Sequence, residues 1–102
     1  MKFFLISDNV DTQHGLRLAG IAGVIVHTEA ELFAELDAAV ADAETAIVLI
    51  TEKAVGLNRR RVYDIKLKIS KPLIVEIPDR HGTLKITDTI RKYVSEAVGV
   101  AL

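Results

Sequence analysis

Four short runs of branched apolar residues, each followed by a segment with helical periodicity, fill most of this chain. The runs lie at residues 3–6, 23–27, 46–50 and 73–77, and the third is apolar at every position, as central strands of parallel sheets are. Strands that alternate with helices cross over right-handedly and give a parallel sheet. The sequence therefore predicts a three-layer α/β sandwich with a four-stranded parallel sheet in the order second, first, third, fourth.

Helices are expected at residues 11–20, 28–41, 51–69 and 87–98. Asp11 or Thr12 is the predicted cap of the first helix, and Gly20 its end. Thr28 and Glu31 have the spacing of a capping box at the start of the second. The third helix is expected to be interrupted near Gly56, because glycine disfavours the helical interior.

The 102 residues are enough for one domain with a single core. We expect residues 1–78 to form an α/β core of Rossmann-like or receiver-like topology. Residues 79–102 are expected to add a loop and a C-terminal helix to the same domain, capable of moving relative to that core. The chain has no cysteine, no visible signal peptide and no apolar run near the roughly 20 residues of a membrane span. A cytoplasmic protein without membrane insertion is expected.

Charge is unevenly distributed although the net charge is only −1. Residues 28–45 carry six acidic and no basic side chains, whereas residues 53–71 carry seven basic side chains against Asp64 alone. The predicted strand order places these two helices on one face of the sheet. We interpret Arg59 to Arg61 as a solvated face partly paired with the acidic helix, because interleaved aromatic residues, typical of nucleic-acid surfaces, are limited to Tyr63. No nucleic-acid partner is predicted.

The carboxyl ends of the strands, where parallel α/β sheets bind ligands, offer little chemistry. Asp8 and Glu52 follow neighbouring strands, so weak cation binding is conceivable, but carboxylates there also favour helix N-termini. The three histidines are too dispersed along the predicted fold to share a metal ion: His14, His27 and His81. We predict no catalytic residue, cofactor or metal. The alternative is a degenerate receiver-like signalling module, or a weak magnesium-dependent phosphoryl-binding protein, using Asp8 and Glu52.

Several segments, in the right order, resemble the F subunit of the V-type (vacuolar/archaeal-type) ATPases and ATP synthases. They are residues 11–21 (DTQHGLRLAGI), 48–52 (VLITE), 72–78 (PLIVEIP), 88–91 (DTIR) and 97–100 (AVGV). The sequence departs from the family at Leu16, where phenylalanine is usual, and at Gly56, which interrupts a usually stronger helix. The resemblance covers essentially the whole chain.

This resemblance implies a small non-catalytic rotor component that couples ATP turnover to ion transport. It implies a place on the central stalk, bound to the coiled-coil D subunit, between the catalytic A/B head and the membrane ring. In the family, the C-terminal helix can leave the globular part and reach toward the head. Here that helix is residues 87–98, and the residues expected to matter in it are Ile86, Ile90, Arg91 and Val94.

For the contact with the coiled coil we favour the first helix and the neighbouring strand ends. Small residues there permit close backbone approach, and longer side chains between them are expected to supply contacts. The candidate residues are Gly15, Leu16, Arg17, Ala19 and Gly20. The competing interpretation is that the glycines only let this helix sit close to its own sheet.

Overall fold

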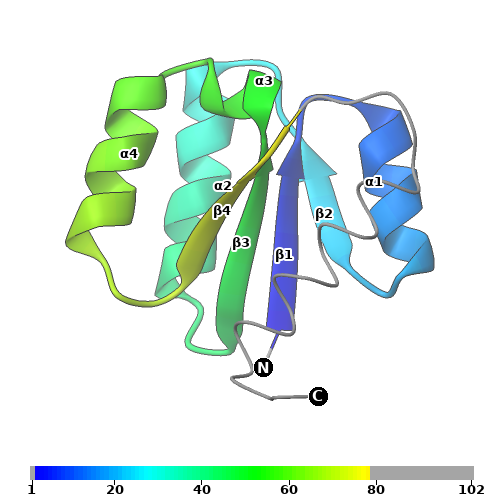
Figure 1. Ribbon diagram of the computed structural model, residues 1–102, viewed down its shortest axis with the longest axis horizontal. Coiled ribbons are helices and arrows are strands. Elements are labelled where there is room, and N and C mark those ends of the chain that lie inside the picture. Colours follow the sequence, from blue (N-terminus) through cyan, green and yellow to red (C-terminus); the bar gives the residue numbers. More distant parts are fainter. Residues whose placement is uncertain (1, 79–102) are drawn as a thin grey trace.

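All four predicted strands form and lie in one parallel sheet in the computed structural model, which describes residues 2–78 (Figure 1). The strands are β1 (Lys2–Ser7), β2 (Ala22–Ile25), β3 (Thr45–Thr51) and β4 (Leu73–Ile77). They are paired in the order β2-β1-β3-β4. The predicted fold class and strand order are confirmed.

The helices are α1 (Val10–Leu18), α2 (Glu29–Ala41), α3 (Glu52–Val55) and α4 (Arg59–Lys68). The predicted interruption of the third helix is confirmed, because α3 ends at Val55, Gly56 is its C-cap, and α4 begins only after Asn58. The expected loop at residues 79–85 and helix at residues 87–98 lie outside the described residues.

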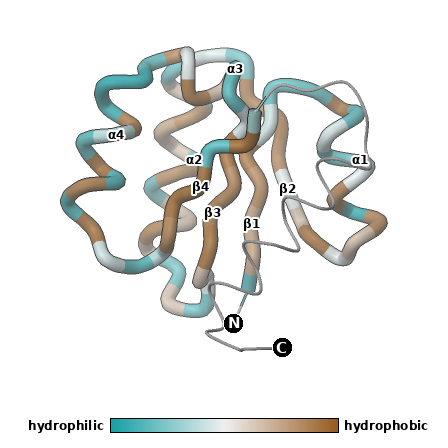
Figure 2. Tube along the Cα trace, in the orientation of Figure 1, coloured by the Kyte–Doolittle hydropathy of each residue, from teal (hydrophilic) through white to brown (hydrophobic). Residues whose placement is uncertain are grey.

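Two hydrophobic clusters pack against opposite faces of the sheet. Helices α2, α3 and α4 contribute to one of them, and α1 contributes to the other. Alternate strand residues point to alternate faces, so Leu5 belongs to the α1 cluster while Ile6 belongs to the α2 cluster. Figure 2 shows the strands as strongly hydrophobic over most of their length. The central strands β1 and β3 are therefore buried on both sides.

The ends of α1 are fixed by local hydrogen bonds, and its N-cap differs from the prediction. Asn9 caps the helix, since its Oδ1 accepts the backbone N–H of Thr12 at 2.7 Å. Thr12 donates in the first turn and Asp11 lies inside it, so neither can be the cap. At the other end, Gly20 adopts φ +85° and donates to the Arg17 carbonyl, as in a Schellman motif.

The predicted capping box at the start of α2 is confirmed. The Thr28 hydroxyl accepts the N–H of Glu31, and the Glu31 carboxylate accepts the N–H of Thr28, both at 3.1 Å. The same carboxylate accepts the N–H of His27 at 2.9 Å. These bonds, chiefly the one from His27, lower the pKa of Glu31.

Helix α4 is held to the sheet and to α2 through polar and aromatic contacts. The Arg59 guanidinium donates to both carboxylate oxygens of Glu76 on β4, at 2.9 and 3.0 Å, and the Tyr63 hydroxyl donates to the same carboxylate at 2.8 Å. Toward α2, the Asn58 amide donates to Glu29 at 2.7 Å. The Arg61 guanidinium lies 4.0 Å from the centre of the Phe33 ring. The two charged helices thus share a face, as predicted.

Gly23 is required by the close approach of β2 to β1. A Cβ at this position would lie 2.8 Å from the Leu5 Cβ and 3.1 Å from the Leu5 carbonyl oxygen. Gly23→Ala is therefore expected to lower the free energy of unfolding by about 1–3 kcal/mol, measured by urea denaturation. Ala22→Ser, at the exposed neighbouring position, is expected to change it by less than about 0.5 kcal/mol. Equal effects of the two variants would contradict this account of β2.

The Arg59–Glu76 pair predicts a specific pH dependence of stability. The hydrogen bonds from Arg59, assisted by Tyr63, lower the pKa of Glu76 below its ordinary value of 4.5. The stabilisation is therefore complete above that value and is lost as the pH falls through the lowered pKa. The melting temperature of the natural chain should exceed that of Glu76→Gln at neutral pH, and the gap should shrink in acid. A gap independent of pH would contradict the assignment.

Candidate partner-docking surface

At the carboxyl edge of the sheet, the hydroxyl groups that end β1 and β3 are hydrogen-bonded within the chain. The hydroxyl of Ser7, a fully buried residue, donates to the Asn9 carbonyl at 2.8 Å and accepts the Asn9 N–H at 3.0 Å. The Thr51 hydroxyl, at the end of β3, accepts the Asp8 N–H at 3.1 Å. The hydroxyl groups at the ends of β1 and β3 therefore both hold the turn that follows β1.

The acidic and histidine candidates do not assemble into a metal site within residues 2–78. No group of three histidine, aspartate or glutamate side chains is placed there to hold an ion. Asp8 accepts the side-chain amide of Asn9 at 3.0 Å, while Glu52 lies in the first turn of α3, where a carboxylate favours the helix N-terminus. His14 lies on α1 and His27 follows β2, whereas His81 lies outside this range.

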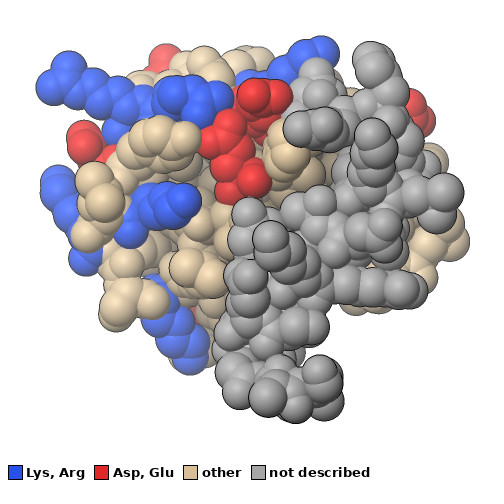
Figure 3. Space-filling model, in the orientation of Figure 1, with Lys and Arg blue, Asp and Glu red and all other residues tan. Residues whose placement is uncertain are grey.

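Basic side chains of the described residues are concentrated on one side of the molecule. Figure 3 shows Lys and Arg side chains gathered on the side of the molecule where α4 lies. Two of these residues have contacts within the fold, since Arg59 pairs with Glu76 and Arg61 covers Phe33. Over the described part of the chain, no helix is long and apolar enough to cross a bilayer.

The predicted contact residues on α1 divide into buried and exposed positions. Leu16 is 1% exposed and packs in the core with Ile21, so its side chain is not available to a partner. We therefore remove Leu16 from the predicted contact residues. Gly15 is half-buried. The remaining candidates are exposed: Arg17, Ala19 and Gly20.

Leu18 is an exposed apolar residue at this end of α1 that the predicted contact set did not include. It is 91% exposed, at the last position of α1, immediately before the small residues that end the helix. The spacing of residues could have indicated this exposure. The buried positions Thr12 and Leu16 are four residues apart on one face of the helix, and Leu18 lies outside that face. A single exposed leucine is common on protein surfaces, but the exposed residues Ala19, Gly20 and Ala22 follow Leu18 closely in the chain. Together they make a mostly apolar exposed stretch, the kind of surface that protein contacts use.

Within residues 2–78, little covers the sheet edge beside this end of α1. Strand β2 is an edge strand whose first residue, Ala22, is exposed and whose other residues are half-buried. We refer to the following exposed residues as the β2-edge surface: Arg17, Leu18, Ala19, Gly20 and Ala22.

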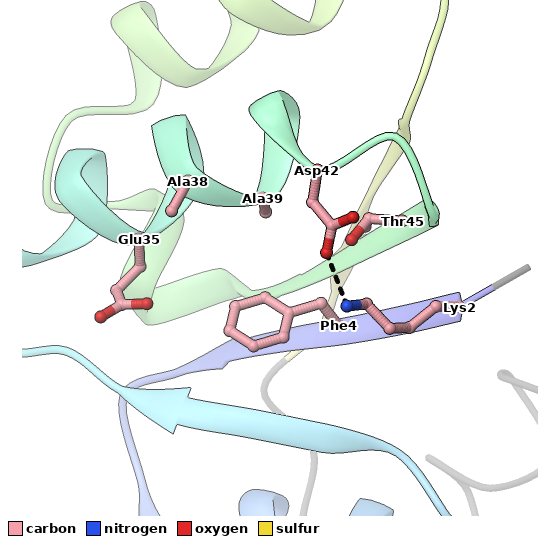
Figure 4. Close-up of a pocket in the computed structure, with 7 residues that line it drawn as sticks. All are labelled: Lys2, Phe4, Glu35, Ala38, Ala39, Asp42 and Thr45. Carbon is pink, nitrogen blue, oxygen red and sulfur yellow. Dashed lines mark hydrogen bonds and ion pairs between the residues drawn. The ribbon is translucent and has the colours of Figure 1, made fainter.

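A small pocket lies next to the start of β2, on the face of the sheet that α2 covers. Its lining consists of Lys2, Phe4, Glu35, Ala38, Ala39, Asp42 and Thr45 (Figure 4). Phe4 is the register partner of Ala22, so the pocket adjoins the start of β2. At one end of the pocket, the Lys2 ammonium lies 2.6 Å from the Asp42 carboxylate. This contact raises the pKa of Lys2 and lowers that of Asp42.

Comparison with known proteins identifies the class of molecule as a component of an ATP synthase. The family model described as ATP synthase (F/14-kDa) subunit matches residues 4–94. The F subunit of the A-type ATP synthase of Methanocaldococcus jannaschii is 32% identical over 103 aligned positions, covering 100% of this chain and 99% of the relative. The corresponding subunits of Pyrococcus abyssi and Thermococcus kodakarensis are each 31% identical, covering 100% of this chain and 98% of theirs.

The chain therefore belongs to the ATP synthase (F/14-kDa) subunit family, as its resemblance to the F subunit predicted. A member of this family is one component of a larger complex. The surfaces through which such a component meets its neighbours are accordingly the relevant functional sites in this fold.

Proposed function

We propose that this chain is the central-stalk (rotor) component of a V/A-type ATP synthase, holding the coiled-coil D subunit through its β2-edge surface. In this role it contributes to coupling ATP turnover in the A/B head to ion transport, without catalysing a reaction itself. It would be a cytoplasmic, peripheral part of a membrane-bound complex. The observation that carries the proposal is the exposure of Leu18 at 91%, beside small residues and β2, the edge strand of the sheet that residues 2–78 form.

The chemistry of the β2-edge surface supports a helical partner. Burying one leucine side chain contributes roughly 1.5–3 kcal/mol, which is a large share of the energy of a modest interface. Ala19 and Gly20 carry little or no side chain, so a partner backbone can approach the end of α1 closely. Arg17, in the last turn of α1, adds a positive charge at the rim.

The rest of the fold supports a mechanical role. The central strands are buried on both faces, so the unit can transmit force as a rigid body. Ser7 and Thr51, at the carboxyl ends of the two central strands, are engaged in turn hydrogen bonds. A surface contact is therefore the activity that the described residues favour.

Leu18 and Leu67 form a matched pair for testing the proposed surface. Leu67 is 84% exposed on α4, on the opposite side of the molecule (Figure 1). Leu18→Glu is expected to weaken binding to the purified D subunit by at least about tenfold, because it places a charge in an apolar contact. Leu67→Glu is expected to leave the affinity within about twofold, and both variants should keep the natural melting temperature. Weakening by Leu67→Glu alone would place the contact on α4 instead.

The proposed contact with the A/B head rests on the helix predicted at residues 87–98, which lies outside the described residues. The residues expected to matter for it are Ile86, Ile90, Arg91 and Val94. We infer that this helix can leave the core, because a partner that offers comparable apolar surface can compete for it. Amide hydrogen exchange of the isolated chain is expected to be faster across residues 87–98 than across β1 and β3. Protection equal to that of the central strands would contradict a detachable helix.

A further inference from the structure

The pocket between β1 and α2 has the size of one side chain. Its volume is about 140 Å³, well below the roughly 300–1,000 Å³ of sites for drug-sized ligands. Phe4 is half-buried, and Ala38 and Ala39 present small side chains from α2 (Figure 4). A carboxylate lies at each end, Asp42 beside Lys2 and Glu35 on the other side of the Phe4 ring.

The two carboxylates that line the pocket attract positive charge, and one of them, Asp42, is paired with Lys2. Lys2 pairs with Asp42, which leaves the carboxylate of Glu35 at the opposite end. Within residues 2–78, Glu35 has no hydrogen-bond or ion-pair partner, and residues 28–45 contain no basic side chain. Glu35 is nevertheless half-buried, at a position where a paired carboxylate is more favourable than an unpaired one.

We propose that this pocket receives one arginine side chain of the coiled-coil partner, with the guanidinium over the Phe4 ring and against Glu35. The inference rests on the proposed function and adds a second contact to it. Arginine fits better than lysine because its planar guanidinium stacks on aromatic rings and binds a carboxylate through two hydrogen bonds. The chain itself contains both geometries, since Arg61 lies over Phe33 and Arg59 binds Glu76 through two bonds.

The position of the pocket supports the same partner as the β2-edge surface. The Phe4 side chain and the Ala22 methyl group lie on the same face of the sheet, because register partners in parallel strands point the same way. Neighbouring strands are about 4.8 Å apart, whereas a helix with its side chains is about 10–12 Å across. One partner helix running along β2 can therefore contact Leu18 and reach the pocket with a long side chain.

The test is the affinity for the purified D subunit of three chains: the natural sequence, Glu35→Gln and Asp37→Asn. Asp37 is an exposed acidic residue on the same helix that does not line the pocket, so its variant controls for the change in net charge. We expect Glu35→Gln to weaken binding about fivefold at low salt and to reduce its salt dependence, while Asp37→Asn stays within about twofold. Phe4→Leu, which keeps apolar volume and removes the ring, should weaken binding about twofold or more.

Three other results would contradict the inference, and each has a different meaning. If the natural chain binds the D subunit and Glu35→Gln binds equally well, the arginine contact is wrong while the proposed function stands. If the natural chain does not bind the D subunit, the proposed function and this inference both fail. If light scattering instead shows a dimer that Glu35→Gln dissociates, the pocket belongs to an interface between copies of this chain.

Discussion

The burial of β1 and β3 on both faces is the constraint on which the rest of this structure depends. Leu5 and Leu49 pack on the α1 side and Ile6 and Ile50 on the α2 side, and all four are fully buried. Each face needs its own helices, so the three-layer arrangement follows from these two strands. The outer strands and helices are then the parts of the described chain that remain open to partners.

The polar groups of the described residues also differ between the central strands and the two edges of the sheet. Near the central strands, Ser7 and Thr51 are buried and committed to turn hydrogen bonds. At the periphery, the β4 side is tied to α4 by the Arg59–Glu76 pair, whereas the β2 side has an exposed Ala22 and an exposed Leu18 nearby. Both edges expose leucines, since Leu67 and Leu73 lie on the β4 side. The ion pair that ties α4 to β4 is therefore our reason for placing the docking surface at β2 and not at β4.

The strand order and the local features of this fold could be predicted from the sequence, whereas the exposure of individual side chains and the pocket could not. The Thr28–Glu31 capping box and the break at Gly56 depend on residues close in the chain. The cap of α1 was misplaced because Asn9, Asp11 and Thr12 are all plausible caps, and the choice moves the start of the helix. The pocket was not predicted because it forms only where Phe4 meets α2, thirty or more residues away in the chain.

A hydrogen-exchange footprint of the chain, alone and in complex with the coiled-coil D subunit, tests the central claim most directly. The account predicts added protection over residues 17–25 and over residues 35–42, the pocket-lining end of α2 with its C-cap, while α4 stays unchanged. A footprint centred on α4 and β4, with residues 17–25 unprotected, would contradict it and place the partner on the opposite edge of the sheet.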